Sequence, residues 1–75
     1  MLRKVESILS QLLKNSPKYE VKVECINEIF FVVILCKDFD FFKLHAQKIK
    51  DFLTSQLGVE LCLGVQNESG KYIMF

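Results

Sequence analysis

Residues 29–36 read Ile-Phe-Phe-Val-Val-Ile-Leu-Cys, the longest uninterrupted apolar stretch in the chain. The stretch is too short for a helix of ordinary size, and its β-branched and aromatic side chains favour extended structure. A strand without polar alternation is typical of a position in which both faces are covered. The stretch therefore predicts a central strand, around which the other elements must be arranged.

The composition is that of one small folded domain. The chain has 75 residues, too few for two hydrophobic cores, so we expect a single domain spanning residues 1–75. Hydrophobic residues make up 51%, which excludes disorder, and the net charge of +1 gives no global attraction to nucleic acid. No apolar run approaches the roughly 20 residues of a membrane span, and the N-terminal residues carry no secretory pattern. We expect a cytoplasmic protein.

The three cysteines, Cys25, Cys36 and Cys62, are an odd number without C-x-x-C spacing, and each falls within a predicted strand. Zinc sites use closely spaced pairs of ligands, and secreted disulfide frameworks are even in number. We therefore expect reduced thiols, no metal site and no cofactor.

The helical periodicity predicts two helices. Residues 2–15 repeat apolar side chains at intervals of three and four, and residues 39–57 do the same. Asp38 or Asp40 can cap the N-terminus of the second helix, and Gly58 can close its C-terminus.

The residues before the central strand alternate between apolar and charged side chains. Residues 19–26 therefore predict a strand with one wet face, most naturally at a sheet edge. If Asn27-Glu28 forms a two-residue hairpin loop, Val23 pairs with Val32, and Val33 lies on the opposite face, behind Lys22. A loop one residue longer or shorter would reverse the two faces.

Two shorter strands are predicted after the second helix. Residues 59–66 alternate and predict a second edge strand. Residues 71–75 are apolar on both parities after Lys71 and predict a central strand. A four-residue turn at residues 67–70 would join them and turn Ile73 and Phe75 away from the helices.

Helix, strand, strand, helix, strand, strand is the element order of a ferredoxin-like βαββαβ fold whose first strand has moved to the end. We therefore expect an α+β fold, an αββαββ two-layer sandwich of circularly permuted ferredoxin-like topology. The expected sheet is antiparallel, with strand order 1-2-4-3 and both helices on one face.

This arrangement leaves one sheet face without a covering element. The face would collect Phe31, Val33, Leu35, Ile73 and Phe75. Each large apolar side chain left in water forgoes about 1.5–3 kcal/mol of burial. We therefore expect a protein–protein interaction or assembly module that buries these interface residues in a homodimer, another homo-oligomer or a larger complex. The alternative is a monomer in which lysine stems and loops screen the patch.

No set of side chains forms a catalytic constellation. His45 is the only histidine, and no Ser or Cys stands at a fixed spacing that would make it the base of a nucleophile. The position of Asp38 and Asp40 at a helix start accounts for both without chemistry. No glycine opens a helix after a strand, as phosphate-binding loops require. We expect no catalytic residues and no enzyme activity.

Lysines of the second predicted helix define an alternative function. Lys43, Lys48 and Lys50 would form the nucleic-acid-binding side of a small ribosome- or RNA-associated factor. A solvated helix face is the competing interpretation.

The run from Ile29 through the second helix to Gly64-Val65-Gln66 and Lys71-Tyr72-Ile73 resembles the middle of ribosomal silencing factors, in which an apolar strand, a helix and a hairpin follow in that order. The chain lacks the Asp-Tyr that opens the strand in that family, and the resemblance covers about half of the chain. The element order is also similar to small periplasmic domains of pilus and type II secretion assembly platforms, and to cytosolic domains of cation-diffusion transporters. No residue motif accompanies these similarities, so we assign no family.

Overall fold

The computed structural model describes residues 1–75, with two helices and four strands in the order expected from the sequence. The elements are α1 (Leu2–Leu12), β1 (Tyr19–Ile26), β2 (Ile29–Cys36), α2 (Phe39–Leu57), β3 (Leu61–Asn67) and β4 (Tyr72–Met74). β1, β2 and α2 begin and end at the predicted residues. α1 ends earlier than predicted and β3 begins later.

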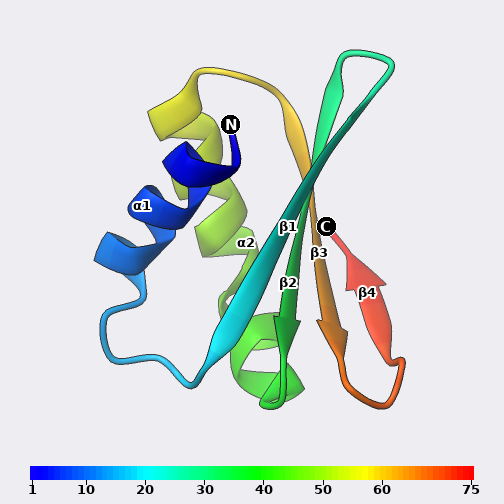
Figure 1. Ribbon diagram of the computed structural model, residues 1–75. Coiled ribbons are helices and arrows are strands. Elements are labelled where there is room, and N and C mark those ends of the chain that lie inside the picture. Colours follow the sequence, from blue (N-terminus) through cyan, green and yellow to red (C-terminus); the bar gives the residue numbers. More distant parts are fainter.

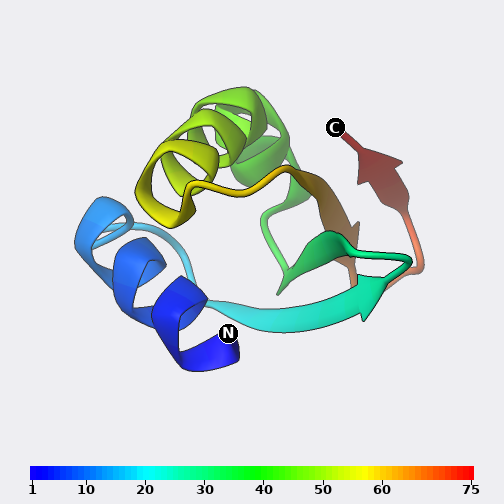
Figure 2. The same ribbon diagram turned by 90° about the horizontal axis from the view of Figure 1, so that it is seen from above.

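Both helices lie on the same side of the sheet, as expected (Figures 1 and 2). The core lies between the helices and the sheet and consists of 13 buried residues, none of them charged. They are Val5, Leu9, Val32, Ile34, Cys36, Phe39, Phe42, Ala46, Ile49, Leu53, Leu61, Leu63 and Val65. The apolar stripes of both helices and every second residue of β2 and β3 therefore meet in one layer.

The ends of α2 are fixed by local side-chain and backbone chemistry. Asp38 is the N-cap, and its Oδ1 accepts a hydrogen bond from the Phe41 amide at 3.1 Å. Asp40 lies in the first turn, where a negative charge favours the helix dipole. Gly58 closes the helix with φ 66° and ψ 24°, the left-handed conformation that glycine adopts without a Cβ clash. The predicted limits of this helix are confirmed.

The hairpin between β1 and β2 has the register predicted from its two-residue loop. Val23 pairs with Val32 and Lys22 with Val33, in antiparallel orientation. Asn27 and Glu28 both have positive φ, 51° and 68°, as a type I′ turn requires. Asn tolerates this conformation well, but Glu does not, so the turn carries strain at Glu28.

Replacing Glu28 by glycine should stabilise the protein, because glycine adopts a positive φ without steric cost. We expect Glu28→Gly to raise the free energy of unfolding by about 0.5–1 kcal/mol, part of the relief being offset by the greater freedom of glycine in the unfolded chain. Urea denaturation measures the change. Glu28→Ala removes the same charge and keeps a Cβ, so it should give no such gain; equal stabilisation by both variants would contradict the argument.

The sheet order differs from the prediction. The strands lie in the order β1-β2-β3-β4, and β2 and β3 are parallel neighbours. The expected antiparallel order 1-2-4-3 and the circularly permuted ferredoxin-like topology are therefore wrong. The structure is an α+β arrangement with a mixed sheet in which α2 connects two adjacent parallel strands (Figure 1).

Strand length explains the observed order. β4 has only three residues, whereas β2 has eight and β3 seven. A three-residue strand between two long ones would leave backbone N–H and C=O groups of both neighbours without partners, which is costly in a buried sheet. β3 can pair with β2 along its whole length, and the short strand is left at the edge. The apolar residues on both parities of β4 predict a strand covered on both faces. Tyr72 and Met74 nevertheless remain about half exposed, because β4 lies at the edge of the sheet.

The hairpin between β3 and β4 has a loop one residue shorter than predicted. The Asn67 amide donates to the Lys71 carbonyl oxygen at 3.0 Å, so the loop consists of residues 68–70. Asn67 Oδ1 accepts from the amides of Ser69 and Lys71, and Gly70 has φ 87°. Val65 therefore pairs with Ile73 rather than with Tyr72. The one-residue difference reverses the faces of β4.

Candidate functional site

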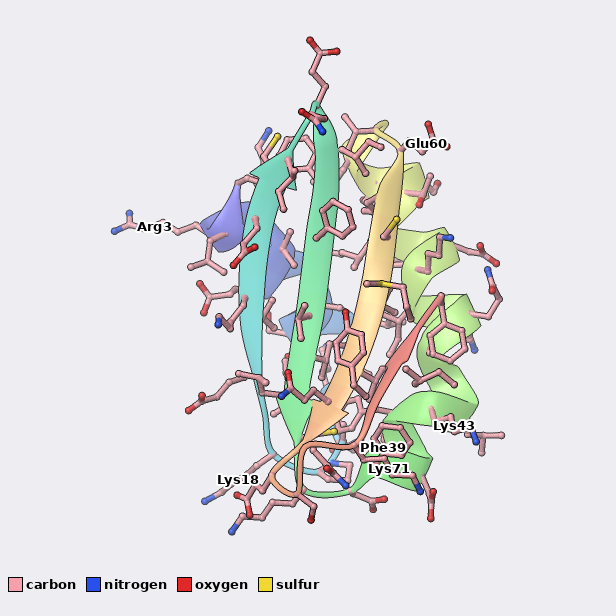
Figure 3. All side chains as sticks on the ribbon, turned by 90° about the vertical axis from the view of Figure 1, so that its right-hand side faces the viewer. Arg3, Lys18, Phe39, Lys43, Glu60 and Lys71 are labelled. Carbon is pink, nitrogen blue, oxygen red and sulfur yellow. The ribbon has the colours of Figure 1, made fainter.

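The side of the sheet opposite the helices has no covering element (Figure 3). We call it the open face. It consists of Phe31, Val33 and Leu35 of β2, Cys62, Gly64 and Gln66 of β3, and Tyr72 and Met74 of β4. Strand pairing places these side chains in neighbouring rows, for example Phe31 beside Cys62 and Gly64 beside Met74. An apolar surface therefore extends over three adjacent strands.

The predicted interface residues are divided between the two faces of the sheet. Phe31, Val33 and Leu35 lie on the open face and are half-buried there. The placement of Ile73 and Phe75 on this face is wrong, because both pack against the core on the helix side. The reason is the length of the loop, which has three residues rather than the four predicted.

Tyr72 and Met74 take the places expected for Ile73 and Phe75. They are 46% and 45% exposed and were missed by the sequence analysis. The signal that would have found them is Asn67 together with Gly70, since a three-residue hairpin loop is usually closed by a glycine in the left-handed region.

The apolar surface continues to the tip of the first hairpin and ends at charged residues. Ile26 and Ile29, a cross-strand pair at the tip, share the parity of Phe31 and are 51% and 40% exposed. Along β1 the face is bordered by the exposed charges of that strand. At the end of the sheet away from the hairpin tip it is bordered by an ion pair of Lys37 and Glu68 at 4.0 Å. An apolar centre with a charged border is the usual composition of a protein–protein interface.

Tyr72 lies across the glycine of β3. A Cβ at residue 64 would be 2.6 Å from the hydroxyl oxygen of Tyr72 and 3.0 Å from its Cζ. The hydroxyl also donates a long hydrogen bond to Met74 Sδ at 3.7 Å. An aromatic ring laid over a strand glycine covers backbone that a side chain would otherwise protect. Gly64 is therefore required for the position of this ring on the open face.

Gly64→Ala should displace the Tyr72 ring and destabilise the protein by about 1 kcal/mol, because the new methyl group occupies the position of the hydroxyl. In a Tyr72→Ala background the same substitution has no ring to displace and should be nearly neutral. The coupling, measured by urea denaturation of the four variants, should be about 0.5–1.5 kcal/mol. Additive effects would contradict the packing of Tyr72 on Gly64.

A hollow of about 660 Å³ lies where the parallel strands β2 and β3 end. This is the edge of a sheet at which open α/β folds bind ligands. Its lining residues are Leu13, Ser16, Pro17, Lys18, Tyr19, Glu20, Leu35, Cys36, Lys37, Asn67 and Glu68. Of these, Lys18, Glu20, Lys37 and Glu68 are exposed, and the groups of chemical interest are the thiol of Cys36 and the phenol of Tyr19.

Neither the thiol nor the phenol is activated. Burial raises the pKa of the Cys36 thiol, and the negative charge of Asp38 raises it further; the thiol donates to the Gln66 carbonyl oxygen at 3.6 Å. Burial and then the charge of Glu6 raise the pKa of Tyr19. A nucleophilic cysteine needs a lowered pKa and an adjacent base. The pKa shifts of both groups are therefore opposite in direction to those of an activated nucleophile.

The three free thiols should differ in reactivity. Cys25 is exposed and Cys62 half-buried, whereas Cys36 is 6% exposed. We expect iodoacetamide at pH 8 to modify Cys36 at least about tenfold more slowly than Cys25, because burial reduces both the access to the thiol and its thiolate fraction. Peptide mapping by mass spectrometry measures the rates. In urea all three should react alike, and fast native labelling of Cys36 would contradict the assignment.

His45 lies between the two helices. Its ring centroid is 4.7 Å from that of Phe41, and it borders a small hollow with Leu12, Leu13 and Lys48. This position is half-buried, and no nucleophile faces the ring in that hollow. The side chain therefore serves packing between α1 and α2.

The lysines expected to form one basic side of α2 do not lie together. At about 100° per residue, Lys50 is about 20° from Lys43 around the helix axis, but Lys48 is about 140° from it. The exposed carboxylates of Asp40 and Asp51 lie in the interval between Lys43 and Lys48. The surface of α2 therefore alternates in charge rather than presenting one basic patch.

No three His, Cys, Asp or Glu side chains gather in a way that could hold a metal ion. Neither helix is long and apolar enough to pass through a membrane. Comparison of the chain with protein-family models, with curated proteins and with solved structures gives no match.

Proposed function

We propose that this protein is a non-enzymatic interaction module that buries its open face against an apolar surface of a partner protein. The observation that supports the proposal is the row of Phe31, Val33 and Leu35, flanked by Tyr72 and Met74, on a sheet face without a covering element. Each large apolar side chain gains about 1.5–3 kcal/mol when it is transferred completely out of water. Contiguous exposed patches of this kind mark interaction sites in soluble proteins.

The dimensions of the face indicate what the partner must present. Its three strands, β2, β3 and β4, lie about 4.8 Å apart and are at most eight residues long at about 3.3 Å per residue, so the face spans roughly 10 by 26 Å. A stable interface buries about 800 Å² on each side, more than this flat area provides. The partner must therefore contact the charged border as well as the apolar centre, and it needs charges that match Lys37 and Glu68.

The absence of an activated nucleophile agrees with a binding role. The raised pKa of Cys36 and the packing of His45 against Phe41 leave neither group poised for catalysis. The division of the α2 lysines gives no support to the alternative of a ribosome- or RNA-associated factor. We further propose a cytoplasmic location, which the three free thiols favour, since thiols persist in reducing compartments.

A photo-crosslinking amino acid at residue 33 tests the open face directly. In cells that produce the protein, p-benzoylphenylalanine at Val33 should give a discrete protein adduct. The matched control is Leu44, which is 79% exposed on α2, away from the sheet. We expect an adduct from residue 33 and none from residue 44.

Val33→Glu should weaken binding of the crosslinked partner at least about tenfold, because docking would bury an unpaired carboxylate. Leu44→Glu adds the same charge and should leave binding unchanged. Circular dichroism checks that both variants are folded. No adduct at residue 33, or equal loss of binding in both variants, would overturn the proposal.

A further inference from the structure

β1 is an open sheet edge along its whole length. It has eight residues, contains no proline and pairs with β2 without a bulge. Figure 3 shows β1 at one side of the sheet, with no strand beyond it. β4, the other edge, has only three residues. Native proteins usually keep edge strands short or bulged, because a long regular edge is a template for pairing with another chain.

The two-residue turn determines which backbone groups of β1 are free. Ile26 and Ile29 flank the two-residue turn as a cross-strand pair. In a hairpin with a two-residue loop this flanking pair is the hydrogen-bonded one, and bonded pairs alternate along an antiparallel ladder. Glu24, Lys22 and Glu20 therefore direct their backbone groups toward β2. The N–H and C=O groups of the odd-numbered residues, Tyr19 to Cys25, point away from the sheet.

The side chains on the open-face side of β1 alternate in charge. Lys18, just before β1, is followed by Glu20, Lys22 and Glu24 at intervals of two residues. All four are exposed, and none takes part in an ion pair, the single ion pair of the chain being Lys37–Glu68. On β2 the three strand residues face only Leu35, Val33 and Phe31. The four charges therefore have no partner within one copy of the chain.

We propose that β1 pairs antiparallel with β1 of a second copy, about a two-fold axis at Val21. In this register Glu20 faces Lys22 of the second copy, and Lys18 faces its Glu24. By symmetry all four charges of each copy face an opposite charge. Antiparallel neighbours of opposite sign stabilise a strand pair, and like charges destabilise it.

Alternation of charge excludes the neighbouring registers. The free backbone groups belong to odd residues, so the register can change only in steps that keep odd residues facing odd residues. A two-fold axis at Lys22 would place Lys22 against Lys22 and Glu20 against Glu24. An axis at Glu20 would place Glu20 against Glu20 and Lys18 against Lys22. A shift of one step in either direction therefore replaces every attraction by a repulsion.

The proposed pair has a simple geometry. The hydrogen-bonded rows would be Val21 with Val21, and Tyr19 with Val23, on the helix side; the charged rows are the closer, non-hydrogen-bonded pairs. The two sheets would join into one, and the two open faces would lie on the same side, because the two-fold axis is perpendicular to the sheet. The contact uses an edge and leaves the open face free, so it does not depend on the proposed docking.

Charge reversal at two positions tests both the pairing and its register. Glu20→Lys makes positions 20 and 22 of facing copies both positive, and Lys22→Glu makes them both negative. The double variant E20K/K22E restores opposite charges in this register only and keeps the net charge of +1. Sedimentation velocity at about 10–500 µM protein and about 50 mM salt measures the dissociation constant, at low ionic strength where charges are weakly screened.

We expect the wild type to dimerise, each single variant to dimerise at least about tenfold more weakly, and the double variant to return to within about threefold of the wild type. Salt at about 1 M should weaken the wild-type dimer, because the charged rows are exposed. Met74→Glu adds a charge to the open face on β4, the strand farthest from β1, and should leave the edge dimer intact, which separates this test from that of the open face. A monomer at about 500 µM, or a double variant as weak as the singles, would overturn the proposal. So would a dimer lost in Met74→Glu and kept in the charge variants.

Discussion

The structure depends on the parity of β2, which the two-residue turn at Asn27 and Glu28 fixes. With this loop length Val32 and Ile34 enter the core, where they are 1% and 0% exposed, and Val33 lies on the other face. A loop of different length would send the alternate set inward. Every residue of β2 is apolar, so hydrophobicity alone does not choose between the two sets. The turn and the alternating charges of β1 decide which set is buried. Glu20, Lys22 and Glu24 cannot lie beneath the helices, because burial of unpaired charges is costly.

Features set by local chemistry are predictable from the sequence, whereas features set by pairing between distant strands are not. The register of the first hairpin and the limits of α2 follow from local chemistry: a two-residue loop, an Asp N-cap and a left-handed Gly58. The sheet order depends on which strands satisfy one another's backbone groups, a property of strand length. The apolar residues on both parities after Lys71 predict a central strand, but three paired residues cannot satisfy the backbone groups of two long neighbours. Length should therefore outweigh hydrophobic pattern when a short strand is placed.

The part of the candidate site on β2 is predictable from the sequence, and the part on β4 is not. Phe31, Val33 and Leu35 follow from the first hairpin, whose register the sequence specifies. Ile73 and Phe75 depended on a loop whose length is set by the Asn67 side chain, which binds the amides of Ser69 and Lys71. The position of the Tyr72 ring over Gly64 has no signature in the pattern of residues. It becomes visible only when the ring and the glycine backbone are placed in three dimensions.

The charges of β1 have two physical consequences for one edge. An edge strand of eight regular residues is prone to pair with any extended chain, and exposed Lys and Glu side chains raise the cost of pairing with apolar strands. If their signs were all alike, the edge would repel every copy of itself in every register. Alternating signs repel in the registers centred on Glu20 and Lys22, but attract in the register centred on Val21. An alternating edge therefore disfavours indiscriminate association and favours the symmetric arrangement centred on Val21, in which all four charges face opposite charges. In this arrangement the odd-numbered backbone groups, left free by the same turn that sets the parity of β2, also find partners.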